Sequence, residues 1–154
     1  MSYPKEAVNS AFLLLPPKMD TRAARVTLAA IGYQESKYLT RVQYGGGPAH
    51  GYWQFESGGG VKGVMNHKAS ADLARKVCHA RGIPFVRATV WEALATDDVL
   101  AAAFARLLMY TDPFSVPDNA ADAWEMYAER CWRPGRPHPD AWPASWAFGL
   151  ERAE

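Results

Sequence analysis

The segment from Asp20 to Gln34 limits the possible folds of this chain more than any other. Its apolar residues lie on most faces of a helix rather than along one stripe: Ala23, Val26, Leu28, Ala29, Ala30 and Ile31. Asp20 stands where an N-cap is expected, because its carboxylate can accept a hydrogen bond from a free backbone N–H. A helix that is apolar all round has to be covered by other elements. The segment therefore predicts a buried central helix.

Helix signals dominate the rest of the chain as well. Capping residues, apolar spacing and stop signals predict helices over residues 4–15, Ser70 to Arg81 with Gly82 in the C′ position, a capping box at Thr89–Glu92, Thr96 to Tyr110, 119–131, and from Pro143 onward. The only strand candidate is Tyr38 to Tyr44, before a glycine-rich turn. We expect a mainly α, single domain over residues 1–154, with at most a small β element after Glu35.

Composition and charge exclude several classes of protein. The chain has 154 residues and a formal net charge of +1, whereas binding to nucleic acid normally requires a basic surface. No apolar run approaches the roughly 20 residues that span a bilayer. The run "AFLLLPP" lacks the flanks of a signal peptide. We therefore expect a monomer that is made in the cytoplasm without a signal peptide, with no stable membrane insertion and no nucleic-acid partner.

Three weaker patterns have simple structural explanations. Gly58 to Gly63 reads G-x-G-x-x-G but lacks the strand and acidic residue of a dinucleotide site, so we expect a flexible turn. The histidines and cysteines show no metal-ligand spacing, and no metal or cofactor is expected. Cys78 and Cys131 are expected to be reduced structural thiols. The stretch "WRPGRPHP" reads as a proline-stiffened helix stop with solvated arginines, or else as a cationic surface for an anionic polymer.

Glu35 is the leading candidate for a catalytic residue. It follows a very apolar helix, where the negative end of the helix dipole disfavours a carboxylate. Burial would act in the same direction, and both effects raise the pKa of a carboxyl group. A carboxyl that keeps its proton near neutral pH is suited to general acid catalysis. The aromatic loop that follows Glu35 is a candidate sugar-binding wall.

The residues around Glu35 resemble a known signature. Glu35-Ser36, followed by "AHGYWQ" with Gln54 19 positions after Glu35, is similar to the "E-S … A-x-G-L-M-Q" signature of lytic transglycosylases and goose-type lysozymes. The stretch 34–67 and the "WRPG" element also resemble phage-borne lysozyme-like proteins. The resemblance implies a lysozyme-like fold.

The resemblance assigns roles residue by residue. Glu35 corresponds to the catalytic acid, Ser36 to a residue that helps hold it, and Gly51 and Gln54 to the loop that lines the cleft. Tyr52 and Trp53 replace the family's Leu-Met pair; Trp53 would either stack on sugar or fill the core. The later "A-Y-N-A-G" motif is absent, and Tyr127 in "AWEMYAERCW" would take the place of the tyrosine that touches the acid.

The implied function is degradation of the bacterial cell wall. A phage or prophage enzyme would cleave the β-1,4 bond between N-acetylmuramic acid and N-acetylglucosamine in peptidoglycan. It would act after release through a membrane pore during host lysis, as an endolysin, or as part of a virion. No acidic residue lies between Lys37 and Phe55, which favours a lytic transglycosylase with one glutamate. Two alternatives remain: a hydrolytic muramidase with Glu56 as second carboxylate, and a non-catalytic virion or wall-binding protein.

Overall fold

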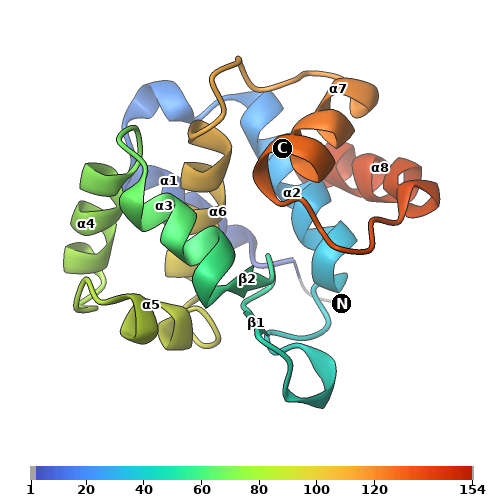
Figure 1. The fold of residues 1–154 in the computed structure, drawn as a ribbon. Helices are drawn as coiled ribbons and strands as arrows, with labels where there is room; N and C mark the ends of the chain where they lie inside the picture. The colour runs from blue at the N-terminus through green and yellow to red at the C-terminus, as the bar shows by residue number, and fades with distance from the viewer. Residues whose placement is uncertain (1–2, 154) are drawn as a thin grey trace.

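The computed structural model describes residues 3–153 and is mainly helical (Figure 1). Its α-helices are Lys5–Leu13 (α1), Arg22–Ser36 (α2), Lys62–Asn66 (α3), Ala71–Ala80 (α4), Arg87–Ala93 (α5), Asp98–Tyr110 (α6), Ala120–Glu125 (α7) and Trp142–Arg152 (α8). Two π-helical segments, Ser57–Val61 (η3) and Met126–Cys131 (η4), continue neighbouring helices, and 3-10 turns occupy Pro17–Met19, Tyr44–Gly46 and Pro139–Ala141. The sheet is an antiparallel pair, Ala49–His50 (β1) and Phe55–Glu56 (β2). The prediction of a mainly α protein with a small β element after Glu35 is confirmed.

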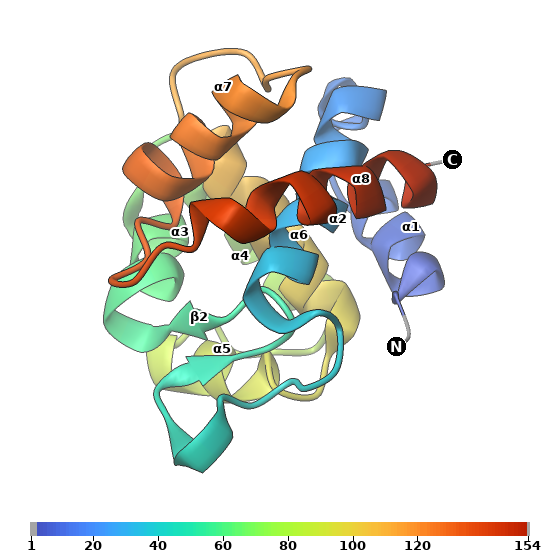
Figure 2. The same ribbon diagram turned by 90° about the vertical axis from the view of Figure 1, so that its right-hand side faces the viewer.

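The central helix is α2, as its apolar composition predicts. Its residues from Val26 to Gly32 are all buried. Helix α8 packs along it, and Figures 1 and 2 show the two helices side by side. The crossing is close because residue 149 is a glycine: a Cβ there would lie 2.4 Å from the carbonyl oxygen of Val26. Helix α6 is the second buried helix, and α1 and α4 pack against it.

Side-chain caps fix three helix starts. The Thr21 hydroxyl accepts the N–H of Ala24 at the start of α2, so the prediction of Asp20 as N-cap is wrong. The Asp20 carboxylate instead forms an ion pair with Arg25. Asp97 caps α6, one residue after the predicted start at Thr96, and Asn119 caps α7.

Two other predicted helix starts need correction. Helix α5 begins at Arg87, so Thr89 lies inside it and forms no capping box. Ser70 does precede α4, but its hydroxyl donates to the carbonyl of Val64 instead of capping. The end of α4 is as predicted, with Gly82 at a positive φ of 71°. Sequence spacing therefore located these helices but misassigned the side chains that start them.

The loops on both sides of the β-hairpin differ from their predicted structures. The run Tyr38 to Tyr44 forms no strand among the described residues, and only an isolated bridge joins Val42 to His50. The glycine-rich run predicted as a flexible turn is helical: η3 continues directly into α3. Val61 and Val64 anchor this helix in the core, both with 0% exposure. Burial of these two side chains outweighs the low helix propensity of glycine.

Candidate active site

Glu35 lies in the last turn of α2, on the wall of a cavity of about 540 Å³. This first cavity is lined by the end of α2, the following loop and the segment after η4: Gln34, Glu35, Ser36, Lys37, Leu39, Thr40, Gln43, Gln54, Tyr127, Pro134, Arg136 and His138. A second cavity of about 420 Å³ is lined by Gln54, Phe55, Glu56, Gly59, Gly60, Leu108, Cys131, Trp132 and Arg133. Gln54 lines both, so the cavities adjoin each other. We refer to them together as the groove.

The environment of Glu35 favours its protonated form. Burial raises the pKa of this carboxyl from 4.5 to about 7; the hydrogen bond from Tyr127 opposes the rise, and the charge of Glu56 adds to it. The direction agrees with the expectation from sequence. Glu35 therefore exchanges its proton near neutral pH, as a group that first donates and then accepts a proton must do.

Tyr127 supplies the polar partner of Glu35. Its hydroxyl donates a hydrogen bond to Oε2 of Glu35, across 92 positions of sequence. The tyrosine is buried, with 2% exposure, and it lies in η4. Burial, together with the Glu35 charge and this hydrogen bond, raises the pKa of Tyr127 far above its usual range, so the phenol remains a donor. The contact predicted for Tyr127 is present in the structure.

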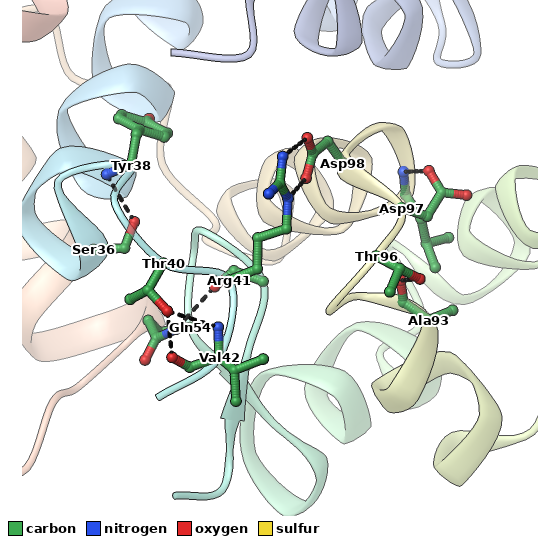
Figure 3. A network of polar contacts seen from close by, with 12 residues as sticks. Ser36, Tyr38, Thr40, Arg41, Val42, Gln54, Ala93, Thr96, Asp97 and Asp98 are labelled. Carbon is green, nitrogen blue, oxygen red and sulfur yellow. Dashed lines mark hydrogen bonds and ion pairs between the residues drawn. The ribbon is translucent and has the colours of Figure 1, made fainter. Parts of the chain in front are cut away.

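Ser36 and the loop after it hold the end of α2 in place. The Ser36 hydroxyl donates to the carbonyl of Gly32 at 3.1 Å. It also accepts the N–H of Tyr38 at 3.1 Å (Figure 3). Ser36 thus stabilises the helix end that carries Glu35 rather than the carboxylate itself. Farther along, the guanidinium of Arg41 pairs with both carboxylate oxygens of Asp98, at 2.8 and 2.9 Å. This ion pair ties the loop to the start of α6.

Gly51 and Gln54 shape the hairpin that borders the groove. Gly51 has a φ of 79°, and a Cβ there would lie 2.8 Å from the carbonyl oxygen of Leu94, so only glycine fits this turn. Gln54 also has a positive φ, 55°, and its side-chain amide donates to the carbonyl of Gly51 at 2.9 Å. Gln54 reaches both cavities, as its predicted place near the sugar requires. Gly51 is buried, and its role is to set the turn.

Tyr52 and Trp53 belong to the core and not to the groove surface. Their exposures are 3% and 1%. The indole N–H of Trp53 donates to the carbonyl of Leu28 in α2 at 2.9 Å, and the ring lies edge-on to Tyr38. The prediction that Trp53 stacks on sugar is therefore wrong, because a bound glycan has no access to either ring face. The structure agrees with the alternative prediction, that Trp53 fills the core.

Glu56 lies at the end of β2, exposed, and lines the second cavity. Its side chain is solvated, although the segment after it is helical and not the flexible turn that the sequence predicts. Its charge is close enough to raise the pKa of Glu35. The structure thus places the two carboxylates on one groove, one half-buried and one in water.

Sequence reasoning missed most of the groove wall. Residues that it did not assign to the site and that line the two cavities include Lys37, Leu39, Thr40, Gln43, Trp132, Arg133, Arg136 and His138. Half of these come from the "WRPGRPHP" run, whose alternative reading as a cationic surface was the one available signal. The solvated-stop interpretation is incomplete, because this run forms one side of the groove.

Comparison with models of protein families, with curated proteins and with solved structures finds no match for this chain.

Within residues 3–153, no group of three or more His, Cys, Asp or Glu side chains could hold a metal ion. No helix in the same range is long and apolar enough to cross a membrane. Cys78 and Cys131 are free and buried.

Replacing Tyr127 with phenylalanine should raise the pKa of Glu35 further. The hydrogen bond from Tyr127 stabilises the ionised carboxylate and therefore lowers the pKa of Glu35. Without this bond, less opposes the effect of burial, which raises the pKa. Titration of the Glu35 carboxyl carbon by NMR measures this directly. Tyr33→Phe is the matched control, because Tyr33 packs on Phe148 and does not line the groove. An unchanged or lower Glu35 pKa in Tyr127→Phe would contradict the assigned role of this bond.

Proposed function

We propose that this protein cleaves the β-1,4 bond between N-acetylmuramic acid and N-acetylglucosamine in peptidoglycan, as a lytic transglycosylase of phage or prophage origin. The observation that carries the proposal is Glu35: a carboxyl of pKa about 7, bonded by a buried tyrosine, on the wall of a cavity of about 540 Å³. The resemblance around Glu35-Ser36 and Gln54 supports it. A lysozyme-like fold is part of the same proposal.

One carboxyl is sufficient for both steps of this reaction. Glu35 gives its proton to the glycosidic oxygen as the bond to C1 breaks, and the acetamido oxygen of the same sugar bonds to C1. The Glu35 carboxylate then removes the proton of the C6 hydroxyl. O6 displaces the acetamido oxygen at C1, which closes a 1,6-anhydro ring. A pKa near 7 suits a group that acts as acid and then as base.

The digestion products test this mechanism. We expect fragments that are lighter by one water than the products of hydrolysis, because the C6 hydroxyl takes the place of water. Mass analysis of digested, purified peptidoglycan measures the difference. Fragments with free reducing ends alone would exclude the transglycosylase and leave the hydrolase.

One observation favours a hydrolytic muramidase as the second candidate. Glu56 lines the adjoining cavity, is exposed and acts electrostatically on Glu35. A hydrolase requires a second carboxylate, either as nucleophile or as the base that activates water. Clearing of a peptidoglycan suspension by the purified protein separates both enzymes from a non-catalytic virion or wall-binding protein, which would leave the suspension turbid.

A further inference from the structure

The segment between η4 and α8 forms one wall of the groove, and this wall is cationic. Arg133 lines the second cavity, and Arg136 and His138 line the first. Lys37, at the end of α2, lines the first cavity as well. In Figures 1 and 2 the segment runs from η4 to α8 above the β-hairpin. This segment therefore contributes two arginines to the lining of the groove.

The backbone of this wall is anchored at both ends. At its start, the N–H groups of Trp132 and Arg133 donate to the carbonyl of Tyr127, at 2.9 and 3.1 Å. At its end, the side-chain amide of Gln34 donates to the carbonyl of His138 at 3.0 Å, and the Ser145 hydroxyl holds the same Gln34. Two prolines, at positions 134 and 137, restrict the segment between these anchors, and a third follows directly at position 139.

The cationic side chains of the wall have no partner within the described chain. Among residues 3–153, no carboxylate pairs with Lys37, Arg133 or Arg136. By contrast, Arg25, Arg41, Arg81 and Arg130 each pair with an aspartate through two N–H groups. All three unpaired side chains are exposed. Their charges are therefore available to a ligand in the groove.

We infer that Lys37, Arg133 and Arg136 bind the carboxylates of the glycan substrate, so that the groove selects anionic over neutral polysaccharide. The inference rests on the proposed function and names its substrate class more closely: a polymer of acetamido sugars that carries free carboxylates on its substituents. A guanidinium presents two parallel N–H donors to a carboxylate, a geometry that a neutral sugar hydroxyl does not match. The groove carries two such guanidinium groups, and the ammonium group of Lys37 adds a third positive charge, against the carboxyls of Glu35 and Glu56.

Binding measurements with three soluble probes test this selection. The probes are purified peptidoglycan fragments with free carboxylates, the same fragments with those groups converted to methyl esters, and chitooligosaccharides of equal length. The protein should bind the free acid about 3- to 10-fold more tightly than the ester or chitin at low salt, a difference expected for exposed ion pairs. Raising the ionic strength should reduce it, because salt screens such pairs.

The double variant Arg133→Gln/Arg136→Gln should lose the preference for the acid while it still binds the ester. Lys68→Gln/Lys76→Gln is the matched control, because it removes the same charge at exposed positions outside both cavities. Equal affinity of the unmodified protein for acid and ester would overturn the inference, and so would loss of the preference in both double variants. Cleavage of the acid fragments is followed separately. Selective binding without cleavage would reject the proposed function and leave the charge selection standing.

Discussion

Glu35→Gln should abolish cleavage of peptidoglycan and leave a folded protein. The amide has nearly the same shape and can still accept the hydrogen bond of Tyr127, but it cannot donate a proton to a glycosidic oxygen. General acid–base catalysis typically contributes about 10²- to 10⁴-fold to a rate, so we expect activity to fall by at least that factor. Clearing of outer-membrane-stripped cells measures the loss. Full activity in folded Glu35→Gln would reject the mechanism.

The same variant should be more stable than the unmodified protein above neutral pH. The pKa of Glu35 is about 7 in the folded chain and close to 4.5 when the group is free. The folded state therefore binds the proton more tightly, and stability falls as pH rises from about 4.5 through 7. Glu35→Gln removes this loss, which we place at about 1–3 kcal/mol at pH 8 for a half-buried group. Melting curves at pH 4.5 and 8 should diverge only at the higher pH.

Glu56→Gln is the matched control for catalysis. Both variants replace one carboxylate on the groove, but Glu56 is exposed and solvated. In the one-carboxyl mechanism it should retain substantial activity. Loss of activity in Glu56→Gln to the level of Glu35→Gln would establish the hydrolase, because only that mechanism needs both groups.

Trp53→Ala should lower the free energy of unfolding by about 3–5 kcal/mol, as the removal of a large core side chain does. Trp53 is 1% exposed, and its indole N–H is bonded to the carbonyl of Leu28 in the central helix. The variant would leave a cavity beside α2 and remove the hydrogen bond from the indole to the Leu28 carbonyl. We expect the melting midpoint to fall by about 10 °C or more, given roughly 2–4 °C per kcal/mol in a domain of this size.

Trp146→Ala is a suitable comparison for this core deletion. Trp146 is only half-buried and packs against Trp142 in α8, so its loss should cost less stability. A small change in midpoint for Trp53→Ala, together with weaker binding of glycan, would restore the stacking role that the buried position argues against.

Local sequence signals identified the parts of the fold that depend on local interactions. The apolar residues of α2, the helix-start signal near Thr96 and the Gly82 stop each act within a few positions of the chain, and the structure agrees with them. The glycine-rich run 58–63 shows the opposite case. Its helical structure depends on the burial of Val61 and Val64 in a core assembled from distant segments. The helix propensities of the residues in this run could not have predicted its helical structure.

The residues of the candidate site also fall into those that the sequence could identify and those that it could not. Glu35 could be identified from its helix and its neighbours, and the tyrosine partner from a resemblance to a family pattern. The role of Trp53 could not be decided, because an aromatic side chain in a loop fits a core and a sugar-binding surface equally well. The cationic wall depends on the anchoring of Gln34 to His138, 104 positions away. The spacing of residues within a short segment does not reveal contacts between positions so far apart in the sequence.

The bond between Tyr127 and Glu35 also has a consequence for the order of folding events. The two residues are 92 positions apart, and a contact that closes so long a loop forms late relative to local helices. During refolding from denaturant, helical ellipticity should therefore recover before the protonation behaviour of Glu35. A stopped-flow experiment would then detect an interval in which the chain is helical and its proton donor is still an ordinary solvated acid. The candidate site, on this view, is among the last parts of the molecule to form.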